Sequence, residues 1–139
     1  MRILFIDFDG VLHAAAGPAD RMRRFVWAPI LHNLIAQHPD IQVVVHASAR
    51  DHTPAETIVA QLGAVGIAVA DVAEPKIPRW EAIQKYLERH PGADYRILDD
   101  APAEFPLECD GLIICDPRVG ISDEAVVERI REWITKEYM

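Results

Sequence analysis

The chain has 139 residues, of which 50% are hydrophobic and 26% are charged, and this composition predicts a single globular domain spanning residues 1–139. Its formal net charge of −8 counts against sequence-independent binding of nucleic acid, which depends on lysines and arginines that neutralise phosphates. No apolar run approaches the ~20 residues that span a membrane, and the N-terminal MRILFID lacks a signal-peptide cleavage pattern, so we expect no membrane partner and a cytoplasmic location.

Five short apolar runs predict the strands of a sheet. They are ILFI at 3–6, IQVVV at 41–45, GIAVA at 66–70, YRIL at 95–98 and GLIIC at 111–115. Each run is continuous rather than alternating in polarity, which is typical of parallel strands that are buried on both faces.

Amphipathic patterns between these runs predict the helices. They cover residues 29–38, 54–62 and 79–90, and the segment that follows Ser122. Thr53 and Pro54 form a favourable cap and first-turn pair, and Ser122 is the expected N-cap of the last helix. The stretch 13–24 lacks periodicity and is expected to form a loop or flap. The alternation of strands and helices predicts a Rossmann-like, three-layer α/β/α sandwich with a mainly parallel five-stranded sheet.

Polar side chains follow four of the five predicted strands at the point where each strand ends. They are Asp7 and Asp9, Ser48 and Arg50, Asp99 and Asp100, and Asp116. In open α/β sheets, ligands bind outside these carboxyl ends. One aspartate at a strand end is usually a turn or helix cap, but several at one edge repel one another unless a divalent cation with oxygen ligands joins them. The pattern therefore predicts a magnesium site.

These segments resemble the motifs of the haloacid dehalogenase (HAD) superfamily of phosphohydrolases. FIDFDGVLH is similar to its first motif, VVVHAS to its second and LDDAPAEF to its fourth. Arg79 fits the cationic third motif best, and Lys76 is the alternative. More narrowly, DFDGVLH, SAR, LDD and DPRVGIS resemble the HAD domain described in Swiss Army Knife RNA-repair proteins. The resemblance implies a phosphorylated substrate and Mg²⁺ as cofactor.

The resemblance also implies a role for each matching residue. Asp7 would attack phosphorus and form an aspartyl-phosphate, while Asp9 would protonate the leaving oxygen and later deprotonate the attacking water. Ser48 and Arg79 would bind the other phosphoryl oxygens. The implied ligands of Mg²⁺ are Asp7, the carbonyl of Asp9, and the pair Asp99 and Asp100.

Several further residues near these motifs have two interpretations each. Arg50 either binds substrate phosphate or pairs with Asp51 or another acid. Asp116 either supports the metal site indirectly or caps the turn that follows it. Isolated histidines are usually surface or supporting residues, so the sequence alone assigns no chemical role to three candidates, namely His13, His46 and His52.

The spacing of the motifs leaves no room for an inserted cap domain. One predicted helix and one predicted strand fill each interval, from Asp9 to Ser48 and from Ser48 to Arg79. Capless members of the family act on large substrates such as proteins or nucleic-acid ends, or borrow a lid from another subunit. The acidic charge counts against nucleic acid and the narrower resemblance counts for it, so the substrate and the oligomeric state stay open.

The function that we favour is a magnesium-dependent phosphatase, because every catalytic residue type is present. One alternative is a binding or regulatory domain that retains the fold and the metal with little turnover. Another is a polynucleotide-end phosphatase of nucleic-acid repair. The presence of both Asp7 and Asp9 favours an active enzyme over a regulatory domain, since a domain without turnover would be free to lose either residue.

Overall fold

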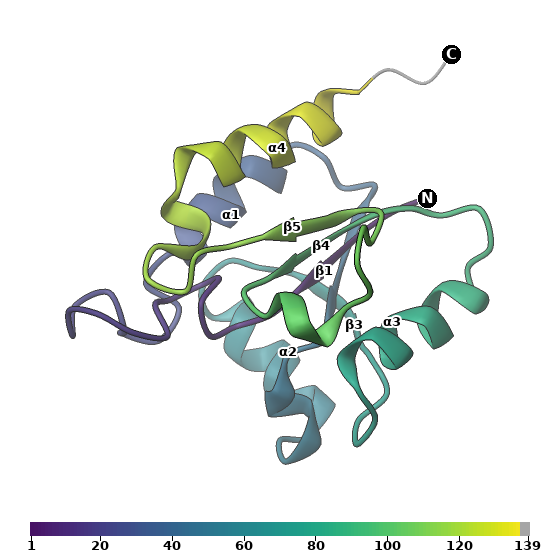
Figure 1. Ribbon diagram of the computed structural model, residues 1–139, viewed down its shortest axis with the longest axis horizontal. Coiled ribbons are helices and arrows are strands. Elements are labelled where there is room, and N and C mark those ends of the chain that lie inside the picture. The colour runs from purple at the N-terminus through teal and green to yellow at the C-terminus, as the bar shows by residue number, and fades with distance from the viewer. Residues whose placement is uncertain (137–139) are drawn as a thin grey trace.

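The computed structural model describes residues 1–136, which form one five-stranded sheet with helices on both faces. All strands are parallel and lie in the order β3-β2-β1-β4-β5. The strands are β1 (Arg2–Ile6), β2 (Ile41–Val45), β3 (Val69–Val72), β4 (Asp94–Asp99) and β5 (Leu112–Ile114). Figure 1 shows the helices above and below this sheet, so the predicted α/β/α sandwich is confirmed.

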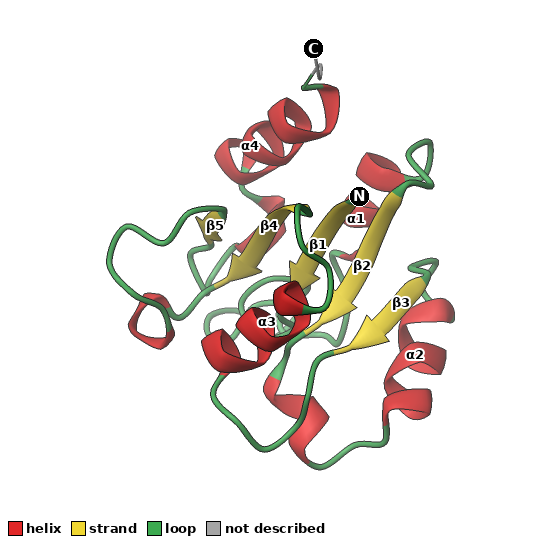
Figure 2. Cartoon of the chain, turned by 90° about the vertical axis from the view of Figure 1, so that its right-hand side faces the viewer, coloured by secondary structure: helices red, strands yellow, loops and turns green. Residues whose placement is uncertain are grey.

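Two core clusters fill the spaces between the sheet and its helices. The helices are α1 (Ala28–Ile35), α2 (Ala55–Gly63), α3 (Arg79–Glu88) and α4 (Glu124–Thr135). Buried residues of α1, α2 and α4 belong to the larger cluster, to which Leu31, Ile58 and Ile130 contribute. The helix α3, which lies in front of the sheet in Figure 2, buries Ile83 in the smaller cluster. Full burial of each such side chain stabilises the fold by about 1.5–3 kcal/mol.

The central strand β1 explains why the apolar runs are continuous. Leu4 and Ile6 face the larger core cluster, whereas Ile3 and Phe5 face the smaller one. Successive side chains of a strand point to opposite faces, and here both faces are covered. A polar residue within this strand would therefore be buried whichever way it pointed.

The third strand begins later than the sequence pattern predicted. The expected run was 66–70, but β3 spans Val69–Val72. Gly66 has a φ of +87°, and the N–H of Ile67 donates to the carbonyl of Leu62 at 2.9 Å. The first residues of the run therefore form the turn that ends α2, because glycine adopts the left-handed conformation that this turn requires.

Two predicted helix caps are wrong by one position. Thr53 donates its N–H to the carbonyl four residues earlier, so it belongs to the preceding turn, and α2 follows Pro54 without a side-chain cap. Ser122 donates its hydroxyl to the carbonyl three residues earlier. The N-cap of α4 is instead Asp123, whose carboxylate accepts from the N–H of Ala125 at 2.9 Å. Aspartate and serine are equally good caps, so residue type alone did not distinguish them.

The connections between the strands are short. A loop and α1 join β1 to β2, while a 3₁₀ helix (Ser48–Asp51) and α2 join β2 to β3. Within the described residues neither connection holds an inserted domain, and residues 14–24 form the irregular loop that the sequence predicted. Of the helices found in residues 1–136, none is both long and apolar enough to cross a membrane.

Candidate active site

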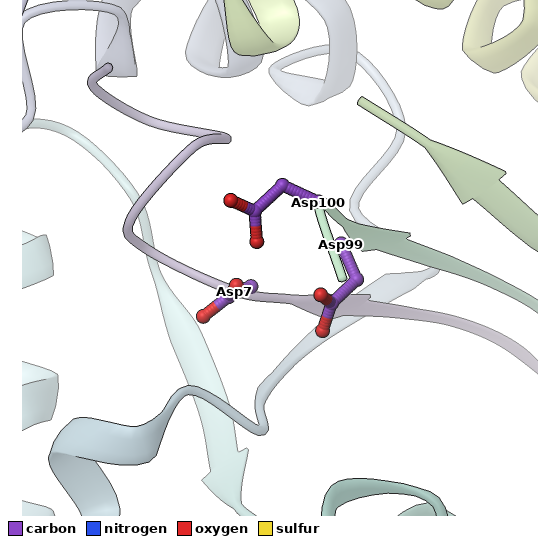
Figure 3. A group of neighbouring side chains, drawn as sticks. All are labelled: Asp7, Asp99 and Asp100. Carbon is purple, nitrogen blue, oxygen red and sulfur yellow. The ribbon is translucent and has the colours of Figure 1, made fainter. Parts of the chain in front are cut away.

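Three of the acids predicted from the strand ends converge at the carboxyl edge of the sheet. Asp7 directly follows β1, Asp99 ends β4, and Asp100 follows it. One carboxylate oxygen from each residue lies within 4.8 Å of the other two, as Figure 3 illustrates. Asp7 is 2% exposed and Asp99 is fully buried. The parallel topology thus places these carboxylates in a largely water-excluded group, hereafter the carboxylate cluster.

Burial and mutual repulsion act on the carboxylate cluster. Burial, together with the negative charge of Asp99, raises the pKa of Asp7 to about 8, although the guanidinium of Arg79 opposes the shift. Burial and the same neighbour also raise the pKa of Asp100. Without a further positive charge, Asp7 is therefore largely protonated at neutral pH. Hard oxygen ligands held this close fit a divalent cation such as Mg²⁺.

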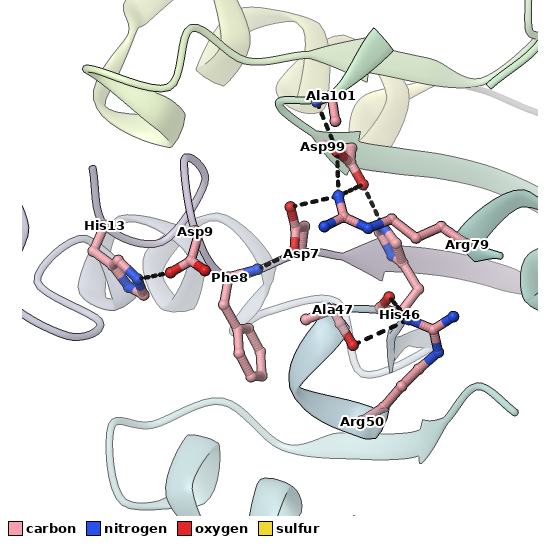
Figure 4. Close-up of polar contacts among 10 residues, drawn as sticks. All are labelled: Asp7, Phe8, Asp9, His13, His46, Ala47, Arg50, Arg79, Asp99 and Ala101. Carbon is pink, nitrogen blue, oxygen red and sulfur yellow. Dashed lines mark hydrogen bonds and ion pairs between the residues drawn. The ribbon is translucent and has the colours of Figure 1, made fainter. Parts of the chain in front are cut away.

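Asp99 differs from its two neighbours because donors surround it. Burial opposes its ionisation, but hydrogen bonds and positive charge lower its pKa overall. Its carboxylate accepts from Nη1 of Arg79 at 2.9 and 3.0 Å, from Nε2 of His46 at 2.8 Å and from the N–H of Ala101 at 2.8 Å. Figure 4 shows these contacts. Both oxygens of Asp99 are thus already engaged within the protein.

Arg79, the first residue of α3, reaches the carboxylate cluster. Its Nη1 lies 3.2 Å from Oδ2 of Asp7, so one nitrogen bridges Asp7 and Asp99. Burial works against the charge on Arg79, but the two carboxylates raise its pKa overall. Lys76 has an exposed side chain, and its backbone N–H donates to Oδ1 of Asp51. Of the two third-motif candidates, Arg79 is the one that contacts the predicted nucleophile.

A small cavity opens beside Asp7. Its volume is about 130 Å³, and its lining residues are Asp7, Phe8, Asp9, Arg24, Ala47, Ser48, Ala49 and His52. Three of the predicted catalytic residues, Asp7, Asp9 and Ser48, therefore share one cavity. Arg24 was not predicted, because its position in an irregular loop gave no signal of its place in the fold.

The side chain of Asp9 is largely exposed, but one buried residue holds it. Oδ1 of Asp9 lies 2.6 Å from Nε2 of His13, and the side chains are 71% and 7% exposed, respectively. The other ring nitrogen, Nδ1, accepts a hydrogen bond from the N–H of Phe25 at 3.2 Å. No role of His13 was predictable from the sequence, because the contact with Asp9 depends on how the loop folds back.

Gly10 permits the close approach of the loop after β1 to the loop after β4. Its φ is +77°, and a Cβ atom at this position would lie 2.2 Å from Oδ2 of Asp100. A side chain here would thus strain the backbone and push Asp100 out of the carboxylate cluster. The Asp–Gly step in the first motif is therefore required by packing as well as by the turn.

Arg50 contacts backbone carbonyls of two loops through its guanidinium. Its guanidinium donates to four backbone carbonyls, those of His46, Ala47, Glu74 and Ile77. The residue is 5% exposed and does not line the cavity. Arg50 thus ties the loop after β2 to the loop before α3. In doing so it positions the start of α3, where Arg79 lies.

His46 is a site residue that the sequence analysis left unassigned. It is fully buried, and its Nε2 contacts Asp99 at 2.8 Å. Burial lowers its pKa, which favours the neutral ring, so Nε2 carries the proton that it donates to the carboxylate. The alternation along β2 could have revealed its direction, since His46 lies two residues after Val44 and contacts Phe105 of the same core cluster.

Asp116 does not join the carboxylate cluster. Its carboxylate accepts from the N–H of Arg118 at 2.9 Å and pairs with the guanidinium of the same residue at 2.8 Å. These contacts lower its pKa. Of its two interpretations, capping of the turn after β5 is the one that the structure supports.

Comparison with known families agrees with this geometry. Residues 3–126 match a family model described as the HAD domain in Swiss Army Knife RNA repair proteins. The match covers well over half of the chain and includes β1, β2, β4 and the start of α3, which together position the site. Neither the curated proteins nor the solved structures compared with the chain gave a match.

Proposed function

The chain belongs to the family of HAD domains in Swiss Army Knife RNA repair proteins, and from this membership we propose that it is a magnesium-dependent phosphomonoester hydrolase. The single observation that supports this most strongly is the setting of Asp7. This buried carboxylate opens onto a cavity, contacts Arg79 at 3.2 Å and lies within 4.8 Å of two further acids. A nucleophile, a fixed cation and a metal-binding donor set thus meet at one point.

In the first step, a carboxylate oxygen of Asp7 attacks phosphorus and forms an aspartyl-phosphate. The bond between phosphorus and the leaving oxygen breaks, and that oxygen takes the proton from the carboxyl group of Asp9. Ser48 lines the cavity and Arg79 lies beside Asp7, so both are placed to bind the other phosphoryl oxygens. The guanidinium of Arg79 is held by Asp7 and Asp99 before the reaction, so it is placed in advance to stabilise the charge that develops in the transition state.

In the second step, water attacks the phosphorus of the aspartyl-phosphate. Asp9, now a carboxylate, takes one proton from this water as the bond between oxygen and phosphorus forms. The bond between Asp7 and phosphorus breaks, inorganic phosphate leaves, and both carboxyl groups return to their starting states. One residue therefore serves as acid and then as base, which requires Asp9 to remain within reach of both oxygens.

We assign Asp7, Asp100 and the carbonyl of Asp9 as the protein ligands of Mg²⁺. The oxygens of Asp99 already accept four hydrogen bonds, so Asp99 instead orients Arg79. When bound, Mg²⁺ favours the ionised form of Asp7 and offsets the charge of the phosphate that this carboxylate attacks. Burial, and then the negative charge of Asp99, raise the pKa values of Asp7 and Asp100, and a bound cation would offset both effects.

We further propose that the substrate is the phosphorylated end of an RNA strand. The family description refers to RNA repair. The cavity of about 130 Å³ is well below the ~300 Å³ of pockets that enclose a drug-sized ligand, so it takes a phosphoryl group and leaves the rest of the substrate outside. An active site without an enclosing cap suits a terminal phosphate on a long chain.

The test is release of inorganic phosphate from p-nitrophenyl phosphate and from RNA oligonucleotides with a 5′- or 3′-terminal phosphate, with Mg²⁺ or with EDTA. Asp7→Asn is the active-site variant, and Asp40→Asn is the matched control at the other edge of the sheet. We expect turnover that needs both Mg²⁺ and Asp7, together with acid-stable label on the protein after rapid quenching. A folded wild-type protein that releases no phosphate from any substrate would favour the regulatory interpretation.

A further inference from the structure

Residues 14–24, part of the loop between β1 and α1, carry positive charge within an acidic chain. The chain has a net charge of −8, but residues 14–24 include three arginines and one aspartate. The four side chains, those of Asp20, Arg21, Arg23 and Arg24, are exposed. A local excess of positive charge attracts a polyanion even where the whole protein repels it.

Arg24 is the arginine of this loop that reaches the active-site cavity. It lines the cavity together with Asp7 and Ser48. Its guanidinium lies 4.6 Å from the ring centre of Phe25 and 5.8 Å from that of Phe8, and Nη2 donates to Oε1 of Gln61 at 3.3 Å. Stacking on two rings holds the planar group in place, so less side-chain entropy is lost when it binds a ligand.

We infer that Arg24 binds the phosphodiester next to the terminal phosphate of an RNA strand, and this inference rests on the proposed function. In this arrangement the terminal phosphoryl group would fill the cavity, and the remainder of the substrate would leave it past Arg24, which lines the cavity. A mononucleotide offers no second phosphate there, whereas an oligonucleotide does. Arg24 thus selects a strand end over a small phosphate ester through a charge-assisted, two-pronged contact.

The experiment compares kcat/KM for a short RNA oligonucleotide with that for the mononucleotide carrying the same terminal phosphate. We expect the wild type to prefer the oligonucleotide, and Arg24→Gln to lower this preference by about tenfold, the size of one lost charge-assisted contact. The slope of log KM against the logarithm of salt concentration should also fall by about one, as expected when one phosphate contact is lost. Arg24→Lys, which keeps the charge but not the stacking, should retain part of the preference.

Arg89→Gln is the control. Arg89 is also exposed, and its guanidinium lies 5.1 Å from the ring centre of Tyr86, but it is at the far end of α3. It should keep the full preference. Equal wild-type activity on the two substrates would overturn the role of Arg24, as would equal losses on both in Arg24→Gln. In those outcomes the wild type still releases phosphate, whereas the absence of release from every substrate, p-nitrophenyl phosphate included, would overturn the proposed function itself.

A second inference comes from the hydrogen bonds of His13. Its Nδ1 accepts from the N–H of Phe25, so this nitrogen carries no proton. The ring is therefore the neutral tautomer with its proton on Nε2, and the 2.6 Å contact to Asp9 is a donation to Oδ1. The backbone reinforces the pair, since the N–H of Gly10 donates to the carbonyl of His13 at 2.8 Å.

We propose that His13 is a positioning residue for the general acid of the proposed reaction. Oδ1 of Asp9 accepts the N–H of His13, so the proton that Asp9 transfers is carried on Oδ2. The same contact stops an otherwise exposed carboxyl group from rotating between orientations. Oδ2 therefore faces the substrate in both steps. It protonates the leaving oxygen in the first step and, once deprotonated, accepts a proton from the attacking water in the second.

The experiment measures formation of the phospho-enzyme in a single turnover with two substrates. An alkyl phosphate needs the acid to protonate its leaving oxygen, whereas p-nitrophenyl phosphate does not. His13→Ala should slow the reaction of the alkyl phosphate at least about tenfold more than that of the aryl phosphate, within the ~10²–10⁴ range of general acid catalysis. His13→Gln, whose amide can donate to Asp9, should restore part of the difference.

His90→Ala is the control, because His90 stacks on Tyr86 at 4.6 Å beyond the end of α3, away from the site. It should leave the ratio of the two rates as in the wild type. Equal slowing of both substrates by His13→Ala would show a structural role only and overturn this inference. If the wild type forms no phospho-enzyme with either substrate, the proposed function fails instead.

Discussion

The two edges of the sheet carry their charges in opposite ways. At the amino edge, Arg2 and Asp40 form an ion pair with atoms 2.7 Å apart, in which the side chain of Asp40 is 59% exposed and that of Arg2 is 11% exposed. At the carboxyl edge, the carboxylate cluster shares a single guanidinium, that of Arg79, in a largely buried space. The first arrangement is neutral, and the second holds more negative than positive charge.

The pKa values follow this difference. The hydrogen bond from Arg2 lowers the pKa of Asp40, whereas burial and like charge raise that of Asp7 to about 8. Surplus charge destabilises a fold, and natural proteins keep it where a ligand compensates for it. The carboxyl edge is therefore the part of the sheet that is organised for binding.

Of the changes that test this difference between the two edges, Asp7→Asn should have the largest effect. An amide cannot act as the nucleophile, so we expect kcat to fall by at least about a thousandfold, as when a catalytic nucleophile is removed elsewhere. The substitution replaces a carboxyl group of the crowded cluster with a neutral amide of nearly the same shape, so the fold should persist. Phosphate release and circular dichroism on the purified variant measure both effects. Wild-type activity in folded Asp7→Asn would exclude Asp7 as the nucleophile.

Removing the shared cation should have the next largest effect. We expect Arg79→Ala to lower kcat by about a hundredfold or more, the loss typical of one pre-positioned stabiliser of transition-state charge. Lys76→Ala should have little effect, because the exposed side chain of Lys76 makes none of the contacts that Arg79 makes. Steady-state kinetics of the two variants under the same conditions will show which residue is the third-motif cation. A larger loss in Lys76→Ala would move the third motif to that residue.

Much of the site was predictable because parallel strands present their ends at one edge. Asp7, Asp99 and Asp100 each lie within one residue of a strand end, so finding the strands located them. The position of Arg79 at the start of α3 followed from the amphipathic pattern of that helix. Local sequence was therefore enough to predict most strands and helices, together with the site residues that lie at their ends.

The contacts that depend on loop direction were not predictable. Arg50 donates to carbonyls of the loop after β2 and of the loop before α3, and Nδ1 of His13 accepts from an N–H twelve residues away. Arg24 reaches the cavity from a loop with no periodicity. The same limit explains the third strand, where the run predicted at 66–70 overlaps β3 only at residues 69 and 70. Turns and loop contacts are fixed by tertiary packing, which residue types alone do not encode.

Mg²⁺ should stabilise the carboxyl edge without affecting the amino edge. Binding to the native state alone adds ~2.7 kcal/mol to the free energy of unfolding when free Mg²⁺ is 100 times its dissociation constant. We expect a rise of several degrees in the melting temperature relative to EDTA at equal ionic strength. Asp100→Asn should abolish this rise, and Asp40→Asn should keep it. A melting temperature that Mg²⁺ leaves unchanged in the wild type would contradict the assigned ligands.

In EDTA, the acids at the two edges should also make contributions to stability that change with pH in opposite directions. Folded Asp7 has a pKa of about 8 against an ordinary value of 3.8, so between these values the folded state holds a proton that the unfolded chain has lost. Its contribution to stability therefore falls as pH rises from about 4 to about 8. Urea titrations across this range should show the decline in the wild type and a weaker one in Asp7→Asn. An equal decline in both would assign it to other groups.

The smallest effect should come from Asp40→Asn at the amino edge. The pKa of Asp40 is lowered in the folded state, so its contribution is present above the ordinary value of 3.8 and is lost as pH falls below it. Exposed ion pairs contribute ~0–1 kcal/mol, and salt screens them further. Arg2 also donates to the carbonyl of Ile134 at 2.7 Å and stacks on Trp133, so its position does not depend on Asp40. Urea denaturation at neutral pH should therefore show little change, and phosphate release should match the wild type. A large loss of stability would mean that the amino edge, like the carboxyl edge, depends on buried charge.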